Sequence, residues 1–356
     1  MSATTDTNDI LFSVQHHIGL ITLNRPNALN ALSFSMFKAL FEQLQAWQHD
    51  DNIHAVVIQA VPGRAFCAGG DVRWVYEVGQ EDPLTPLALF KHEYRLNRLI
   101  SELGKPYIAL MDGVTIGGGV GITLHGSHRV ASEKFAFSMP EASIGFFPDI
   151  GSSHLLSACP GGFGLYLGLT GQRVNAADSK AFGFVDYTVP STAFSNILGD
   201  LFSADLSIAA EEKVSDCIQK YQEKMPAGFS ASEINAVSQY FENKAVLRDV
   251  FEALEQDGSE WASETQAILQ EQSPLSLHIA FEQLRRAKGM NLADCLAMDY
   301  GLAYYFLNGR DFYEGVRARL VDKDKAPQWQ PATLDAVLDS EVTCYFEKPA
   351  EVASLW

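Results

Sequence analysis

The sequence has few basic residues for its length and many more acidic ones. Lys and Arg together number 26 against 44 Asp and Glu, which gives a formal net charge of -18 over 356 residues. Proteins that bind nucleic acid need clustered Lys and Arg to neutralise phosphates. The composition therefore argues against a nucleic-acid partner, although a local basic pocket can still hold a phosphorylated small molecule.

Cysteines and long apolar runs are also scarce. The cysteines, odd in number and widely spaced, are Cys67, Cys159, Cys217, Cys295 and Cys344. They form no legible disulfide or zinc framework, and the nine histidines show no metal-ligand spacing, so we expect no metal. No apolar run reaches the ~18 residues that span a bilayer, and the first residues do not read as an export or organelle signal. We therefore expect a cytoplasmic protein without a membrane partner.

Strand and helix patterns alternate in the first half of the chain. The apolar run at 53–61 is typical of a strand that is buried on both faces, and residues 105–114 indicate a further strand. Residues 28–50 have the apolar spacing of three and four that indicates an amphipathic helix. From about residue 191 only helical spacing continues. The sequence therefore predicts an α/β core over 1–190 and a helix-rich region over 191–356.

Two glycine-bearing loops are candidates for binding an anion. Gly117, Gly118 and Gly119 follow an apolar run, and the small residues 67–70 precede Asp71. Glycine lets another group approach the backbone closely, and backbone N–H groups at such loops stabilise negative charge. Taken singly, the glycine triplet also fits an ordinary tight turn or a close contact with a helix.

Three carboxylates stand in apolar surroundings. Glu141 and Asp149 each follow a proline within a stretch of apolar and small residues, and Glu93 falls inside the apolar stripe of a helix expected over 86–103. Carboxylates in such surroundings have shifted pKa values and are site candidates. The alternatives are that the Pro-acid steps merely start helices or turns, and that Glu93 lies at the stripe edge with a basic partner.

These segments together resemble the enoyl-CoA hydratase/isomerase (crotonase) superfamily. The matching segments, in the family's order, are LNRPNALNAL, GRAFCAGGD, DGVTIGGGVGI, FSMPEASIGFFPD and TGQRVNAADSKAFGFVD. Within the superfamily the chain most resembles the 3-hydroxyisobutyryl-CoA hydrolases, through HEYRLN at 92–97, PEASIGFFPD and the C-terminal DFYEGVRARLVDKDKAPQW. The resemblance implies a crotonase-type spiral of repeated ββα units with a helical C-terminal portion.

The resemblance also implies roles for individual residues. The backbone N–H groups of Ala68 and Gly118 would form an oxyanion hole, and Glu141 and Asp149 would carry out catalysis. Glu93 would contact the substrate. The two catalytic carboxylates and Gly118 would contact the substrate as well.

The phosphates of CoA need basic partners. Arg25 matches the family's first loop and is the favoured contact, with Ala68 beside the CoA ester, and a second basic cluster lies near Lys323. CoA is then part of the substrate, and no separate cofactor is expected. Superfamily members resemble one another in forming trimers and hexamers, which leaves a homo-oligomer open here.

One departure from the hydratase pattern bears on the reaction. Hydratases of this superfamily use two glutamates, the first lying two residues after the glycine triplet, and that position here is Gly121. The resemblance therefore implies a thioesterase acting on 3-hydroxyisobutyryl-CoA, with 3-hydroxypropionyl-CoA as a second candidate substrate, in valine breakdown. Two alternatives stay open: hydratase or isomerase activity that uses Glu141 alone, and non-catalytic binding of an acyl-CoA.

Overall fold

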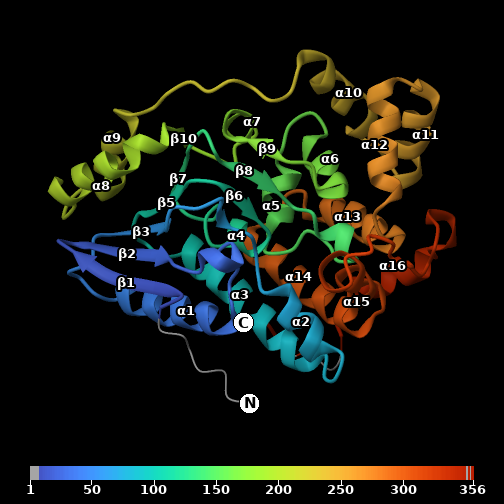
Figure 1. The fold of residues 1–356 in the computed structure, drawn as a ribbon, viewed down its shortest axis with the longest axis horizontal. Coiled ribbons are helices and arrows are strands. Elements are labelled where there is room, and N and C mark those ends of the chain that lie inside the picture. The colour runs from blue at the N-terminus through green and yellow to red at the C-terminus, as the bar shows by residue number, and fades with distance from the viewer. Residues whose placement is uncertain (1–7, 350–351, 353) are drawn as a thin grey trace. The chain divides into compact units, whose positions relative to one another are not determined.

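The computed structural model describes residues 8–349, 352 and 354–356 (Figure 1). The chain forms two compact units, and each is assembled from three stretches of sequence. The first contains residues up to 71, 95–137 and 174–228, and the second contains 72–94, 138–173 and the residues from 229 onward. The predicted boundary at residue 190 stays a prediction, although the described elements after strand β10 (Tyr187–Thr188) are all helices.

The first unit contains two sheets. The larger sheet has the order β1-β2-β3-β5-β7-β10, and the smaller has the order β4-β6-β8-β9. The remaining strands of the larger sheet are β1 (Ile10–Gln15), β2 (Ile18–Leu23), β3 (Ala55–Ala60), β5 (Tyr107–Met111) and β7 (His128–Ala131). The strands of the smaller sheet are β4 (Ala65–Cys67), β6 (Val114–Ile116), β8 (Ala136–Ser138) and β9 (Val174–Asn175).

From β3 to β8, successive strands alternate between the two sheets. Strands β3, β5 and β7 pair in parallel in the larger sheet, and the strand after each of them, β4, β6 or β8, belongs to the smaller sheet. Parallel neighbours need long crossover connections, and these contain helices such as α3 (Leu84–Ser101) and α4 (Gly118–Gly121). The predicted fold class, a spiral of ββα units followed by a helical portion, is confirmed.

Helices cover both faces of the larger sheet. On one face, α8 (Phe194–Ser203) and α9 (Ala210–Gln219) bury Ile197 and Ile218 against apolar strand residues such as Val57. Helix α1 (Phe34–Gln48) lies on the other face. Its Trp47 ring packs against Gly19 of β2, where an added Cβ would lie 2.6 Å from the ring. Side chains alternate between the faces along a strand, so Gly19 makes room for the Trp47 ring.

The second unit is built from helices. They are α2 (Val72–Gly79), the first part of α3, the 3-10 helix η2 (Glu141–Ile144), α5 (Ser152–Ser157), α6 (Phe163–Thr170), α10 (Ala231–Phe241), α11 (Leu247–Asp257), α12 (Glu260–Gln270), α13 (Pro274–Ala287), α14 (Leu292–Asn308), α15 (Asp311–Val316) and α16 (Asp339–Tyr345). Helices α6 and α13 connect this unit: α6 contacts α5, α10, α12 and α13, and α13 also contacts α5, α11 and α16. Within the described residues, none of the helices combines the length and apolarity needed to cross a bilayer.

Candidate active site

The three predicted carboxylates come together inside the second unit. Glu93 of α3, Glu141 at the start of η2 and Asp149 are 3%, 7% and 5% exposed. The charges of Asp149 and Glu141 both raise the pKa of Glu93, and the charge of Asp149 raises that of Glu141. Charges shift one another's pKa in this way only when they are close. The interpretation of Glu93 as a buried member of the helix stripe, rather than an acid at its edge, is confirmed.

Burial is the largest cause of the altered acidity of this cluster. Removal from water raises the pKa of Glu93 and of Glu141 well above the usual range, and it raises that of Asp149 to about 7. The Oε2 atom of Glu141 has no hydrogen-bond partner within the described residues. The same part of the chain contains no set of three or more His, Cys, Asp or Glu side chains arranged to hold a metal ion. The cluster therefore offers one carboxyl oxygen, on Glu141, that has no partner among the described residues, and a second carboxyl, on Asp149, whose pKa burial raises to about 7.

Tight backbone packing fixes the position of Glu141. Its 3-10 helix ends at Gly145, which has a φ of +68°, and a Cβ there would lie 2.1 Å from the carbonyl oxygen of Asp311. A Cβ at Gly315 would likewise lie 2.3 Å from the carbonyl carbon of Ile144. Two glycines therefore let η2 and α15 touch backbone to backbone, which leaves little freedom for Glu141.

The loop that carries Asp149 is held on both sides. Tyr94 donates a hydrogen bond of 2.8 Å to Oδ2 of Asp149. Gln283 of α13 donates to the carbonyl of Pro148 at 2.9 Å and to Oδ1 of Asp299 at 2.7 Å. Oδ2 of Asp299, on α14, accepts a 2.7 Å bond from the N–H of Gly151. Asp149 is thus oriented by one phenol, while two buried side chains clamp the backbone around it.

Sequence reasoning missed these supporting residues. Tyr94 lies within the HEYRLN segment but was assigned no role there. Asp299 lies in the long apolar stretch of α14, so an acid in an apolar stripe was an available signal. Burial raises its pKa well above the usual range. Gln283 gave no comparable signal.

The two predicted oxyanion loops lie side by side in the first unit. A Cβ at Gly119 would lie 2.5 Å from the carbonyl oxygen of Cys67, and one at Gly69 would lie 3.6 Å from the backbone nitrogen of Gly118. The absence of side chains at these glycines therefore allows the triplet to contact the loop of Ala68. The structure brings Ala68 and Gly118 near each other, as the oxyanion interpretation requires.

One of the two expected donors is engaged in the structure. The N–H of Ala68 donates a 3.0 Å hydrogen bond to the carbonyl oxygen of Leu29. Leu29 has a left-handed backbone conformation, with a φ of +53°. The next residue, Asn30, ties this loop to β4 through bonds from Nδ2 to the carbonyls of Ala65 and Phe66, at 3.2 and 3.0 Å. A thioester oxygen that uses the Ala68 N–H must first displace the Leu29 carbonyl.

The predicted phosphate contact Arg25 has carboxylate partners. Its guanidinium lies 3.1 Å from Oδ2 of Asp71 and 3.4 Å from Oδ2 of Asp9. The second basic cluster is similarly compensated, because Arg317 forms ion pairs with Glu314, Asp322 and Asp324. The role of Arg25 toward CoA stays a prediction, and any phosphate there would compete with these two acids.

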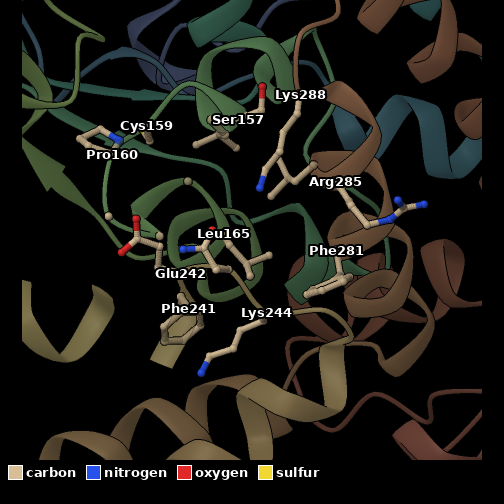
Figure 2. Close-up of a pocket in the computed structure, with 16 residues that line it drawn as sticks. Ser157, Cys159, Pro160, Leu165, Phe241, Glu242, Lys244, Phe281, Arg285 and Lys288 are labelled. Carbon is tan, nitrogen blue, oxygen red and sulfur yellow. The ribbon is translucent and has the colours of Figure 1, made fainter. Parts of the chain in front are cut away.

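A separate pocket of the second unit lies at the turn between α5 and α6 (Figure 2). Figure 2 shows Lys244, Lys288 and Phe241 on the walls of the pocket. The volume of the pocket is about 220 Å³. None of the three clustered carboxylates lines it. Sites for drug-sized ligands usually enclose about 300–1,000 Å³, so this hollow is small for an acyl-CoA.

Curated proteins with similar sequences share one name. The chain is similar to "3-hydroxyisobutyryl-CoA hydrolase, mitochondrial" of Xenopus laevis, with 40% identity over 333 residues that cover 92% of this chain and 86% of the relative. The human protein of the same name is 36% identical over 353 residues, covering 98% of this chain and 91% of the relative. The resemblance to this group of hydrolases is confirmed.

The expectation of a cytoplasmic location is wrong. It was inferred from a missing signal, and a missing signal does not specify a compartment. The relatives from Xenopus laevis, chicken and human are all mitochondrial proteins by name.

Solved structures and a family model match almost the whole chain. A carnitinyl-CoA dehydratase from Mycobacterium thermoresistibile has a TM-score of 0.90 and 34% identity, with 98% of both chains covered. An enoyl-CoA hydratase from Rhodobacter sphaeroides 2.4.1 has a TM-score of 0.87 and 34% identity, with 95% of this chain and 97% of that chain covered. The model described as "Enoyl-CoA hydratase/isomerase" matches residues 18–346. The chain therefore belongs to the enoyl-CoA hydratase/isomerase family.

Proposed function

We propose that the protein hydrolyses the thioester of 3-hydroxyisobutyryl-CoA, releasing the free hydroxy acid and CoA, with 3-hydroxypropionyl-CoA as a second substrate. The observation that carries this proposal is the buried pair Glu141 and Asp149. Oε2 of Glu141 has no hydrogen-bond partner among the described residues, and burial raises the pKa of Asp149 to about 7. The names of the curated relatives support the same reaction. A place in valine breakdown and assembly into a homo-oligomer stay parts of the proposal.

In the proposed first step, Glu141 acts as the nucleophile. An oxygen of its ionised carboxylate attacks the thioester carbonyl carbon, the C–S bond breaks, and the sulfur takes a proton from the carboxyl of Asp149. Burial raises the pKa of both carboxyl groups, so the pair retains a proton near neutral pH, and the reactive form is the one in which that proton lies on Asp149 and Glu141 is ionised. Covalent catalysis by a carboxylate replaces one difficult step with two easier ones.

In the proposed second step, water hydrolyses the mixed anhydride. The water oxygen bonds to the acyl carbon and the bond from that carbon to Glu141 breaks. One water proton passes to Asp149 and replaces the proton that left with the CoA thiol, and the other water proton stays on the product acid. A variant of this mechanism keeps Glu141 as a general base for direct attack by water. Trapping a covalent acyl group on Glu141 by mass spectrometry favours the first mechanism, and its absence during turnover favours the second.

The backbone N–H groups of Ala68 and Gly118 are the proposed oxyanion donors. Each such donor contributes about 3 kcal/mol to transition-state stabilisation in measured oxyanion holes. Ala68 becomes available only when the Leu29 carbonyl leaves it. Substrate binding is therefore expected to include a change in the loop that contains Leu29.

Glu93 is the proposed partner of the substrate's 3-hydroxyl group. A site that bonds a hydroxyl rejects substrates without one, because its buried polar group would stay unpaired. Wild type should prefer 3-hydroxyisobutyryl-CoA over isobutyryl-CoA, and Glu93→Leu should reduce this ratio of kcat/KM by about a hundredfold. An unchanged ratio in a folded variant would remove Glu93 from this role.

Hydration or dehydration is the competing function, and the names of the two solved structures favour it. Gly121 opposes it, because it removes the first glutamate of the usual acid/base pair. Crotonyl-CoA distinguishes the two reactions. Formation of 3-hydroxyacyl-CoA without free thiol would refute the hydrolase proposal, and binding of acyl-CoA without any turnover would support a non-catalytic protein.

A further inference from the structure

A buried side-chain amide in the first unit lacks hydrogen-bond partners among the described residues. Asn97, in the last turns of α3, is 0% exposed, and within the described residues neither Oδ1 nor Nδ2 has a hydrogen-bond partner. Buried polar side chains are almost always bonded, because an unpaired group loses its bonds to water without replacement. Asn97 therefore indicates a polar ligand that binds at this position.

The amide of Asn97 occupies the space beside Gly121. A Cβ at position 121 would lie 2.6 Å from Nδ2 and 3.1 Å from Oδ1 of Asn97. Any side chain at 121 would push the amide aside, so the glycine and the asparagine fit as a pair. Gly121 belongs to the same helical turn as Gly118, since the two residues begin and end α4. The free amide thus lies next to the turn whose first N–H is the proposed oxyanion donor.

An amide at this place suits a water molecule. It offers N–H donors and an oxygen acceptor, so it can hold one water by two different bonds. It does not titrate near neutral pH, so it cannot remove the proton from that water. It can therefore orient water for attack without adding a charge of its own.

We propose that Asn97 binds the hydrolytic water and positions it for attack on the acyl carbon whose oxygen is held by Gly118. This inference rests on the proposed function. In the step concerned, the water oxygen forms the new bond to the acyl carbon and the bond to Glu141 breaks. One water proton passes to the carboxylate of Asp149, and the other remains on the product acid. Asn97 exchanges no proton and acts only by holding the water.

Competition between water and hydroxylamine tests the proposal. With 3-hydroxyisobutyryl-CoA and a fixed hydroxylamine concentration, the products are the hydroxy acid and its hydroxamate, and mass spectrometry gives their ratio after subtraction of the enzyme-free reaction. In Asn97→Leu the water loses its binding site while hydroxylamine still arrives from solution. The hydroxamate-to-acid ratio should therefore rise by about fivefold or more. Gly121→Ala retains Asn97 but moves its amide out of position, so it should also raise the hydroxamate-to-acid ratio.

Asn30 provides a matched control for folding. It is also a buried asparagine, but its Nδ2 bonds to the carbonyls of Ala65 and Phe66 and its Oδ1 accepts from the N–H of Arg25. Asn30→Leu should lower the melting temperature clearly, whereas Asn97→Leu should leave it unchanged or raise it. A drop in melting temperature for Asn97→Leu as large as for Asn30→Leu, with an unchanged product ratio, would show a purely structural role.

The outcomes separate the two proposals. Suppose that wild type hydrolyses the substrate but that the product ratio of folded Asn97→Leu stays at the wild-type value. The inference about Asn97 then fails alone. Asn97→Ala replaces the leucine variant in this test if the latter does not fold. If wild type releases no thiol, the proposed function fails, and the inference fails with it.

Discussion

Tyr94 donates a hydrogen bond of 2.8 Å to Oδ2 of Asp149, and both residues are buried. The bond favours the ionised carboxylate and so opposes burial, which raises the pKa of Asp149 to about 7. Tyr94→Phe keeps the ring and removes the bond, so the pKa of Asp149 should rise further. If protonated Asp149 supplies the proton to sulfur, thiol release declines above about pH 7 in wild type. In the variant this decline should begin about one pH unit higher.

Tyr107 supplies the control for that pH profile. It is also a buried tyrosine, and its hydroxyl donates at 2.9 Å to the carbonyl of Ile122 in the first unit. Tyr107→Phe should leave the alkaline limb of the pH–rate profile where it is. An unchanged limb in Tyr94→Phe would contradict the role given to Asp149.

The raised pKa of Asp149 also predicts how stability varies with pH. The folded value is about 7 and the ordinary value is 3.8, so folding takes up a proton between these pH values. The contribution of this group to the free energy of unfolding must therefore fall as pH rises from about 4 to about 7. Between about pH 5 and pH 8, the free energy of unfolding should fall by about 2–3 kcal/mol more in wild type than in Asp149→Asn. Urea unfolding of both proteins at the two pH values measures this difference in the free energy of unfolding. Equal changes in wild type and Asp149→Asn would contradict the raised pKa of Asp149.

The close packing of η2 against α15 can be tested at Gly145. Gly145 and Gly258 both have left-handed φ values, +68° and +61°. A Cβ at position 145 would lie 2.1 Å from the carbonyl oxygen of Asp311, whereas a Cβ at position 258 would have no other described residue within 4 Å. Gly258→Ala should cost about 1 kcal/mol of stability through φ alone. Gly145→Ala should cost about 1–3 kcal/mol more and slow thiol release, because the clash displaces Glu141. Equal losses from the two substitutions would show that η2 tolerates displacement.

The local elements were predictable because their signals are local. Asn is a common helix cap, and the side chain of Asn175 accepts a 2.9 Å bond from the N–H of Asp178 at the start of α7 (Ala176–Ala181). Proline interrupts a helix, and α5 ends and α6 begins on either side of Pro160. Strand β1 was missed, because four of its six residues are exposed and its apolar pattern is correspondingly weak.

The supporting contacts of the site were not predictable in the same way. Gln283 and Asp299 reach the loop of Asp149 from helices more than a hundred residues later in the chain. The bond between the Leu29 carbonyl and the Ala68 N–H joins two backbone groups, which have no signature in a sequence. Asn97 becomes informative only beside Gly121, and that proximity depends on how α3 and α4 pack. Long-range packing decides each of these cases.

The most direct test of the proposed hydrolysis is thiol release from 3-hydroxyisobutyryl-CoA and from isobutyryl-CoA, by wild type and by Glu141→Gln. The amide keeps the shape of the side chain but cannot act as a carboxylate nucleophile or base, so release should fall by about a hundredfold or more. The account predicts rapid release from the hydroxylated substrate by wild type alone. Release that persists in Glu141→Gln, or no release from either substrate by wild type, would contradict it.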